Sequence, residues 1–334
     1  MTAPVLSLQD LQLDYPLEGG RRMRAVDGVN LSIAPGETLA LVGESGCGKS
    51  SVARAVMRLA APSGGRILFE GQDLASLPRA HLQWLRRRFQ MVFQDPISSL
   101  NPQRKVREIL ETPLRVAGLF DRRSAPTRIR QALEQVGLDA EAVAERYPHE
   151  FSGGQCQRIS IARALVLEPT LLVCDEPVSA LDVSVRAQVL NVLNELRSRL
   201  GLSMLFVSHD LAVVRNVADR VAVMYLGRIC EVGDAEAVLG RPAHPYSAAL
   251  LSAVPIVQAG VRPQRIALRG EIPSPIALPS GCRFRTRCPG AQARCAEQEP
   301  PLAKGPDGRA VACHFPFSVA LPSRTPKARH GDAA

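Results

Sequence analysis

Short apolar runs recur along the first 240 residues, and patterns typical of helices separate them. The clearest runs are TLALVG from Thr38, MVF at 91–93, LLVCD at 171–175 and MLFVS at 204–208. Continuous apolar runs of this length are typical of strands that are buried on both faces. Because the strands alternate with helices, the pattern predicts a parallel α/β sheet. Near the start of the chain, leucines between Leu6 and Leu13 alternate with polar residues, as in a strand with one buried face.

Two stretches interrupt this alternation. Between Asp95 and Glu150 the pattern is helical and polar, and residues 79–130 contain twelve Lys/Arg against four Asp/Glu. This excess predicts either a solvated helical face or a surface that meets a membrane protein under an anionic leaflet. The last 80 residues hold twelve of the 26 prolines. That composition predicts a separate, loop-rich tail that is disordered after Pro322.

Composition narrows the class of protein. The chain has 334 residues, of which 46% are hydrophobic, so it buries a substantial core and is not disordered as a whole. Its formal charge of +9 favours an anionic partner without identifying one. Only 4% of the residues are aromatic, which disfavours a surface that stacks nucleic-acid bases and favours a phosphate ligand.

The sequence predicts a cytoplasmic protein without a membrane-spanning segment. The uncharged stretch from Pro242 to Val261 contains three prolines and a histidine, so it is not a clean apolar helix. The start, MTAPVLSLQDLQLDY, lacks the basic region, apolar run and cleavage site of a secretory signal. Eight cysteines in such a chain do not indicate a disulfide framework.

A glycine-rich loop at residues 43–50 is the first candidate binding site. Its sequence, GESGCGKS, fits the phosphate-loop pattern and lies between a predicted strand and a predicted helix. In such loops the backbone N–H groups and the helix N-terminus bind phosphate oxygens. Lys49 is expected to reach the β- and γ-phosphates and Ser50 to bind Mg²⁺. The alternative is an ordinary tight glycine turn.

Two carboxylates, Asp175 and Glu176, follow the apolar strand at 171–175. The carboxyl ends of parallel strands form the edge of the sheet where phosphate ligands bind. We expect Asp175 to hold Mg²⁺ and Glu176 to polarise the attacking water. The alternative is that the two carboxylates cap a helix, because Pro177 follows them.

The segment FSGGQ at 151–155 resembles the signature sequence of ABC-type ATPases, with Phe where Leu is common. The order of the other motifs over residues 1–240 is similar to the same family. Tyr15 resembles the aromatic residue that stacks on adenine, Gln94 the glutamine between core and helical subdomain, and His209 the switch histidine. Residues 179–182, SALD, resemble the loop that contacts the second subunit. Directly after the signature, Cys156 departs from the Arg often found at that position in the family.

Each of these residues also has a structural alternative: Tyr15 as a buried strand residue, Gln94 as an ordinary loop residue, and His209 as part of a helix start. The resemblance implies that two nucleotide domains pack head to tail, with each ATP between the phosphate loop of one and the signature of the other. It implies catalytic roles for Glu176, His209, Lys49 and Gln94, and Mg²⁺ ligands in Ser50, Gln94 and Asp175. The nucleotide-binding candidates are Tyr15, Gly43, Glu44, Ser45, Gly46, Cys47, Gly48, Lys49, Ser50, Ser51, Gln94, Ser152, Gly153, Gly154, Gln155 and Asp175.

The segments RPAHPY at 241–246 and GEIPSP at 270–275, with the cysteines that follow, are similar to the ATPases of peptide (dipeptide/oligopeptide) and nickel importers. This resemblance implies an ATPase that energises import of di- or oligopeptides, with nickel or glutathione-like compounds as alternative cargo. A soluble, non-transport ABC ATPase and a regulatory module without turnover are the rivals. For His244 we expect a helix-start residue, because Pro245 and Tyr246 follow.

The tail also offers four thiolates for one metal centre, at Cys282, Cys288, Cys295 and Cys313. Zinc sites usually contain close cysteine pairs, which are absent here. The spacing and the resemblance favour a structural [4Fe-4S] cluster, with Zn²⁺ and free thiols as alternatives. His314 is a further candidate ligand.

These observations together predict an ABC-type phosphate-loop core with an antiparallel β subdomain, a helical subdomain and a small Cys-rich tail. The expected regions are a nucleotide-binding domain at 1–240 with the helical subdomain inserted at about 95–154, a C-terminal region at 241–320 and a tail at 321–334. The resemblance implies a second ATPase subunit, expected to be a paralogue, two membrane permease subunits and an extracytoplasmic peptide-binding protein. Nucleic acid is not expected as a partner, and the expected location is the cytoplasmic face of the inner membrane.

Overall fold

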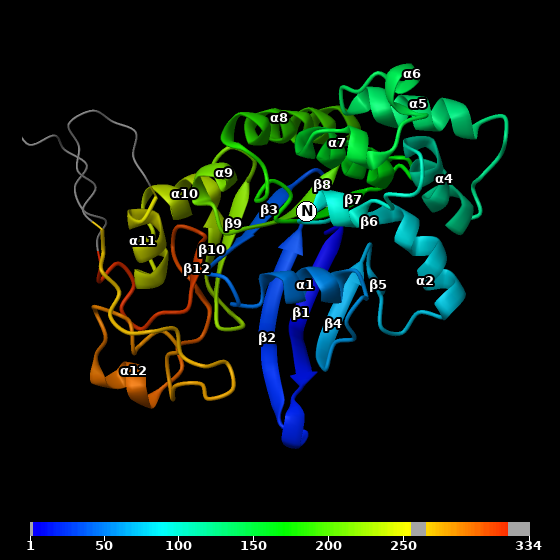
Figure 1. Cartoon of the computed structure of the whole chain (residues 1–334). Helices are drawn as coiled ribbons and strands as arrows, with labels where there is room; N and C mark the ends of the chain where they lie inside the picture. The colour runs from blue at the N-terminus through cyan, green and yellow to red at the C-terminus, as the bar shows by residue number, and fades with distance from the viewer. Residues whose placement is uncertain (1–2, 255–264, 320–334) are drawn as a thin grey trace, which may run out of the picture.

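The computed structural model describes residues 3–254 and 265–319, which form two β-sheets, a helical region and a C-terminal region (Figure 1). The predicted disorder after Pro322 lies outside the described residues. No helix in the described part of the chain combines the length and apolar character that a membrane crossing requires.

The first sheet is antiparallel and has the strand order β2-β1-β4-β5. Its strands are β1 (Leu6–Pro16), β2 (Arg22–Ile33), β4 (Gly64–Phe69) and β5 (Gln72–Asp73), with the short helix η1 (Glu18–Gly20) between β1 and β2. The leucines of β1 that the alternating pattern identified are buried. The expected antiparallel subdomain is therefore present.

Five parallel strands form the centre of the second sheet, in the order β9-β3-β8-β7-β6. They are β3 (Thr38–Val42), β6 (Phe89–Val92), β7 (Leu171–Asp175), β8 (Ser203–Ser208) and β9 (Arg220–Tyr225). The alternation of side chains along β3 divides the core. Leu39 and Leu41 pack toward the antiparallel sheet, whereas Ala40 and Val42 pack toward the helical region. The parallel α/β sheet predicted from the apolar runs is thus confirmed.

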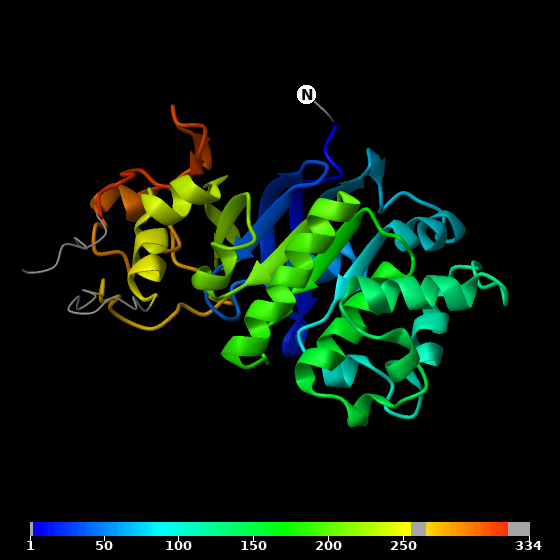
Figure 2. The ribbon, with the colours of Figure 1, turned by 90° about the horizontal axis from the view of Figure 1, so that it is seen from above.

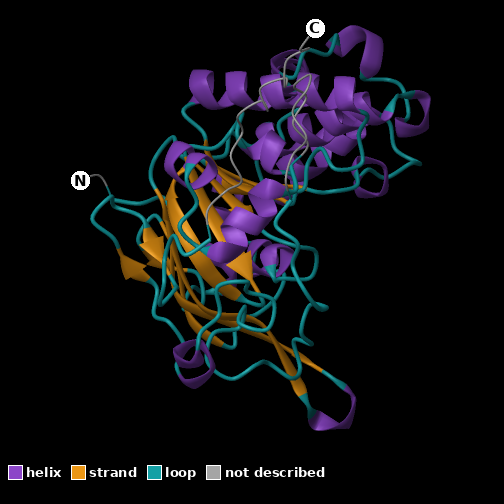
Figure 3. Ribbon diagram, turned by 90° about the vertical axis from the view of Figure 1, so that its left-hand side faces the viewer, coloured by secondary structure: helices purple, strands orange, loops and turns teal. Residues whose placement is uncertain are grey.

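Helices connect these strands and lie on both faces of the sheet (Figure 3): residues 49–56 pack on the face toward the antiparallel sheet, whereas residues 183–200 pack on the opposite face. The helices next to the core strands are α1 (Lys49–Val56), α8 (Val183–Leu200) and α9 (Leu211–Val214). Between β5 and β7 lie α2 (Arg79–Leu85), η2 (Arg86–Arg88), α3 (Pro96–Ser99), α4 (Val106–Val116), α5 (Ala125–Gln135), α6 (Ala140–Val143), η3 (Pro148–Glu150) and α7 (Gly153–Leu165). This helical region and the C-terminal region lie at opposite ends of the sheet (Figure 2).

The C-terminal region continues the second sheet instead of forming a detached tail. After β9 come β10 (Arg228–Asp234) and α10 (Ala235–Gly240), and the C-terminal region that follows them contains α11 (Pro245–Ser252), α12 (Ala293–Glu297), β11 (Ala303–Lys304) and β12 (Ala310–Val311). Strand β12 pairs with β10, and β11 pairs with β12. The prediction of a separate tail missed this pairing, because two-residue strands in a proline-rich stretch carry no periodic signal.

Candidate functional site

The phosphate loop lies between β3 and α1, as its sequence predicts. Gly48 precedes α1 with φ of 110°, and a Cβ there would lie 2.3 Å from the carbonyl oxygen of Ala25. Only glycine fits both this conformation and this close approach. The loop lines a cavity of about 720 Å³.

Lys49 is buried within its own loop. Its Nζ donates hydrogen bonds to the carbonyl oxygens of Gly43 (2.8 Å) and Glu44 (2.9 Å), and the residue is 4% exposed. The ammonium group is therefore held at the cavity floor, where an arriving phosphate can replace the two carbonyls as its partner.

Ser50 and Asp175 meet directly although 125 positions separate them in the sequence. The Ser50 hydroxyl donates to Oδ1 of Asp175 at 2.9 Å. Burial raises the pKa of Asp175, and the neighbouring Glu176 carboxylate raises it further, whereas the bond from Ser50 opposes both. A hydroxyl beside a carboxylate is the oxygen donor set that Mg²⁺ prefers, so these residues fit the ion.

Three candidate catalytic residues converge at the carboxyl ends of neighbouring strands. Oε2 of Glu176 lies 3.0 Å from Nδ1 of His209 and accepts a hydrogen bond from Nε2 of Gln94 at 3.3 Å. They follow β7, β8 and β6, which are adjacent in the sheet, and all three line the phosphate-loop cavity. The backbone of Glu176 has φ of 48°, which is uncommon for a residue with a side chain and concentrates at functional sites.

Tyr15 lies in β1, and its hydroxyl donates to Oγ of Ser51 at 3.4 Å. It is outside the residues that line the cavity. Its contact with adenine therefore stays a prediction.

The cavity also includes residues that sequence patterns did not identify. They come from β2, from the turn between β9 and β10, and from the C-terminal region, and they are Met23, Arg24, Ala25, Leu226, Gly227, Leu250 and Pro275. Pro275 ends the GEIPSP segment at 270–275, whereas the other six belong to no local motif and reach the site through long-range packing.

The signature segment lies apart from this cavity. Oγ of Ser152 accepts from the N–H of Gln155, and the Gln155 side chain accepts from the N–H of Ser152, which forms a capping box at the start of α7. A Cβ on Gly154 would lie 2.2 Å from Val185, so α7 approaches α8 closely here. None of residues 152–155 lines the phosphate-loop cavity. The phosphate loop and the signature, for which anion binding is a prediction, thus lie at different places in one chain.

The loop at 179–182 connects the two segments. Oγ of Ser179 donates to the carbonyl oxygen of Glu176 at 3.0 Å, and Leu181 lies next to Gly153. Cys156, which departs from the usual Arg, is buried with Sγ 3.4 Å from the carbonyl oxygen of Pro148. Its backbone N–H donates to the carbonyl oxygen of Ser152 at 2.9 Å, as part of the first turn of α7.

The four C-terminal cysteines line one small cavity at the end of the chain. The N–H of Cys282 donates to the carbonyl oxygen of Cys295 at 2.8 Å, and burial raises the pKa of Cys313 to about 11. All eight cysteines are unpaired. Within residues 3–254 and 265–319, no three His, Cys, Asp or Glu side chains are arranged to hold a metal ion. The expected iron–sulfur centre is therefore not supported by this geometry.

The two histidines near these cysteines have other partners. Nε2 of His314 lies 2.9 Å from the carbonyl oxygen of Gln298. Nδ1 of His244 accepts from the N–H of Tyr246 at 3.0 Å and caps α11, which agrees with the helix-start prediction. Burial lowers the pKa of His244 to about 4, so it is neutral at pH 7.

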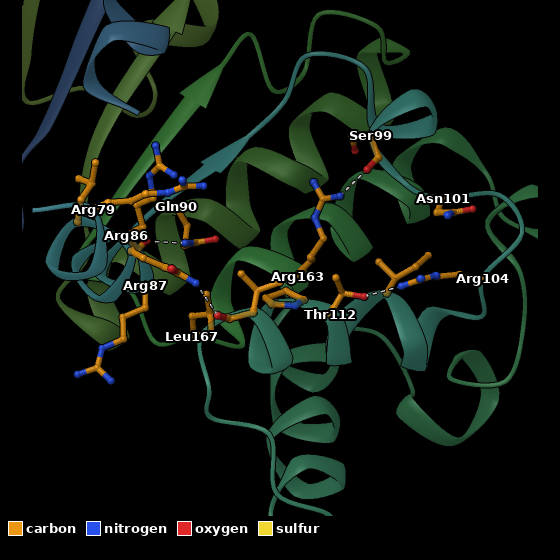
Figure 4. A pocket seen from close by; sticks show the side chains of 16 residues that line it. Arg79, Arg86, Arg87, Gln90, Ser99, Asn101, Arg104, Thr112, Arg163 and Leu167 are labelled. Carbon is orange, nitrogen blue, oxygen red and sulfur yellow. Dashed lines mark hydrogen bonds between the residues drawn. The ribbon is translucent and has the colours of Figure 1, made fainter. Parts of the chain in front are cut away.

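A second, strongly basic groove lies between α2 and α4 and has a volume of about 860 Å³ (Figure 4). No carboxylate is among the described residues that line it, whereas five arginines are. They are Arg79, Arg86, Arg87, Arg104 and Arg163. Four of the twelve Lys/Arg at residues 79–130 thus line one concave surface together with Arg163.

Comparison with known proteins agrees with the sequence motifs. Residues 26–179 match the family described as ABC transporter, and residues 230–295 match the family described as oligopeptide/dipeptide transporter, C-terminal region. A probable peptide ABC transporter ATP-binding protein, y4tS, of Sinorhizobium fredii is 47% identical over 98% of this chain and 94% of its own length. The oligopeptide transport ATP-binding protein AppF of Bacillus subtilis is 47% identical over 93% of this chain and 97% of its own.

Solved structures show the same fold. The dimeric ATP-binding cassette MJ0796, in a post-hydrolysis state with ADP and Pi, superposes with a TM-score of 0.62 at 28% identity. The match covers 69% of this chain and 98% of that one. CbiO1 of Clostridium perfringens, part of an ABC transporter complex, has a TM-score of 0.63 at 30% identity and covers 72% of this chain and 92% of its own.

Proposed function

This chain belongs to the ATP-binding subunits of peptide ABC transporters, and from that membership we propose that it hydrolyses ATP to drive the import of di- or oligopeptides. The observation that carries the proposal is the convergence of Glu176, His209 and Gln94 on the phosphate-loop cavity, beside the bonded pair Ser50 and Asp175.

ATP and Mg²⁺ are the expected substrate and cofactor. Ser50 and Asp175 would hold the ion, with Gln94 as a further ligand, and a bound Mg²⁺ neutralises phosphate charge. Lys49 exchanges its two carbonyl partners for the β- and γ-phosphates. Loop N–H groups at residues 45–51 bind the β-phosphate at the start of α1.

Glu176 orients and polarises a water for attack on the γ-phosphorus. The new P–O bond forms as the bond to the β,γ-bridging oxygen breaks, so ADP leaves and the water proton passes to Glu176 and then to phosphate or solvent. His209 and Gln94 both contact Oε2 of the Glu176 carboxylate, which orients the base and leaves Oε1 for the water.

The separation of the signature from the phosphate loop supports a composite site shared by two ATPase subunits. Ser152 and the free N–H groups at the start of α7 offer a second anion site that the same chain does not use. We propose that the second subunit is a paralogue, and a second copy of this chain is the alternative outcome of the dimer experiment in the Discussion.

The basic groove supports docking of a membrane permease. Five arginines without a carboxylate in the lining attract a segment that carries Asp or Glu, or the carbonyl end of a helix. The chain would then attach peripherally to the cytoplasmic face of the membrane through two permease subunits, which receive peptide from a binding protein.

Reversing the groove charge tests this attachment. We expect Arg86→Glu with Arg104→Glu to weaken binding to the detergent-purified permease by at least about tenfold, because an attraction becomes a repulsion. The matched control is Arg122→Glu with Arg123→Glu, which makes the same charge change on an exposed turn outside the groove. Equal weakening by both pairs in surface plasmon resonance would refute the groove as the docking site.

Peptide cargo is favoured over the alternatives, because the similar proteins above are described as peptide transport subunits. Nickel and glutathione-like cargo are not among those descriptions. The match at 230–295 also disfavours a soluble, non-transport ABC ATPase. We propose residue 240 as the boundary between the nucleotide-binding domain, with the helical subdomain at about 95–154, and the C-terminal region.

We also propose that Cys282, Cys288, Cys295 and Cys313 bind a structural [4Fe-4S] cluster, with Zn²⁺ as the alternative metal. Support comes from the four cysteines that line one cavity and from their spacing, although they are not arranged as a ligand set here. A cluster would require these thiols to move closer and lose their protons.

The proposal predicts that protein purified without oxygen is brown and contains iron. In the Cys288→Ser variant we expect the brown visible absorbance and most of the iron to be lost, because one of the four ligands is removed. Elemental analysis distinguishes iron from zinc. A colourless wild-type protein without bound metal would leave only free thiols in the tail.

A further inference from the structure

The segment between Cys282 and Cys288 reaches the phosphate loop. Arg287 donates two hydrogen bonds to the Glu44 carboxylate, from Nη1 to Oε2 at 2.6 Å and from Nη2 to Oε1 at 3.0 Å. Paired guanidinium and carboxylate groups of this geometry are among the strongest ionic contacts in proteins. The Arg287 side chain is only 9% exposed, so solvent screens the pair weakly.

The Glu44 carboxylate lies where its charge would act on a bound triphosphate. It is the second residue of the phosphate loop, and its backbone carbonyl accepts from Lys49. Glu44 and Glu176 are the two carboxylates among the described residues that line the cavity. A free carboxylate here would repel a triphosphate, whereas a carboxylate paired with arginine is neutralised.

The two carboxylates have different partners. Glu176 faces His209 and Gln94 and keeps its charge available for a water. Glu44 has both oxygens bonded to Arg287, which is not among the cavity-lining residues, so the pair holds this carboxylate at the cavity wall.

A second contact from the C-terminal region supports the same loop. The N–H of Glu44 donates to the hydroxyl of Tyr246 in α11 at 2.9 Å. The Tyr246 ring packs on Phe284, with centroids 5.2 Å apart, and on Tyr225, with centroids 4.7 Å apart. The same buried cluster thus connects the segment that contains Arg287 to the phosphate loop.

We propose that Arg287 is a positioning residue of the nucleotide site: by pairing with Glu44 it removes a negative charge from the path of the triphosphate and fixes the start of the phosphate loop. Nucleotide affinity therefore depends on docking of the C-terminal segment. The proposal rests on the proposed ATP site and adds to it a residue 238 positions after Lys49 that contacts no nucleotide.

The test is titration of the full-length chain with Mg²⁺ and the non-hydrolysable analogue AMP-PNP by calorimetry. We expect Arg287→Ala to raise the Kd on the order of tenfold at low salt, because Glu44 becomes an unpaired charge. Raising the salt concentration should reduce this difference, since it screens the repulsion. Arg287→Lys should bind more tightly than Arg287→Ala, because the positive charge is kept, and less tightly than the wild type, because lysine cannot make the two parallel hydrogen bonds to Glu44.

The decisive variant combines Arg287→Ala with Glu44→Gln. With no carboxylate left unpaired, we expect most of the wild-type affinity to return, which a purely structural role of Arg287 would not produce. Arg285→Ala is the matched control, because Arg285 bonds only to Ser280 within its own segment. We expect it to bind as the wild type does.

Each outcome is decisive. Wild-type affinity in Arg287→Ala, or a double variant as weak as Arg287→Ala, would overturn the role of Arg287. If Arg287→Ala does not fold, as judged by circular dichroism, the affinity of the double variant alone decides. Failure of the wild-type chain to bind AMP-PNP would instead overturn the proposed ATP site itself.

Discussion

Glu176→Gln is expected to lower the rate of ATP hydrolysis by about 10²–10⁴-fold, the range that a positioned general base contributes. The amide keeps the size of the carboxylate and its contact with Gln94 but cannot accept the water proton. Because phosphate contacts are untouched, nucleotide binding should persist. Phosphate release measured under saturating Mg²⁺ and ATP gives the rate.

The same variant should accumulate a closed, ATP-bound pair of subunits, because a composite site that cannot hydrolyse ATP does not reopen. Size-exclusion chromatography with light scattering measures this directly. A dimer of the purified chain would identify a second copy as partner, whereas a monomer that dimerises only with a related subunit supports the paralogue. Normal turnover in Glu176→Gln would remove the residue from the role of base.

Lys49→Ala is expected to reduce kcat/KM for ATP by on the order of 10²-fold or more, the range for loss of one preorganised donor to a charged transition state. The effect is large because Lys49 is buried and aimed at the cavity by two loop carbonyls. ATP should raise the Tm of the wild type and leave that of the variant unchanged, since stabilisation follows binding.

A matched lysine supplies the control for this experiment. Lys105 lies at the surface before α4 and pairs with Glu145 at 2.9 Å. Surface pairs of this kind contribute little to stability, so Lys105→Ala should keep both the ATPase rate and the shift in Tm. Nucleotide-dependent stabilisation that survives in Lys49→Ala would show that another cation binds the phosphates.

Contiguous motifs were predictable because their geometry is local. The phosphate loop is six residues between a strand and a helix, so glycine spacing and the following Lys49 describe it without any long-range information. The geometry of the signature is also local, since Ser152 and Gln155 form a capping box within four positions. Buried strands were predictable from apolar runs, because both faces of the central sheet are covered.

The convergence of distant residues was predictable only through family resemblance. Gln94 and His209 are weak signals alone, and the strand order β3-β8-β7-β6 brings them to Glu176. The predicted metal centre could not be judged from the sequence. Cysteine spacing and the resemblance indicated a ligand set, but the positions of the thiols depend on how loops without a periodic pattern pack. In the described residues these side chains are not arranged to hold a metal ion.

The sequence by itself determined the α/β core and the position of the phosphate loop between a strand and a helix, because each depends on neighbours within a few positions along the chain. Only the tertiary structure decided that β12 joins the central sheet, that five arginines form one groove, and that Arg287 pairs with Glu44. Those arrangements result from packing between segments as much as 243 positions apart, and no local propensity encodes the pairing of such segments.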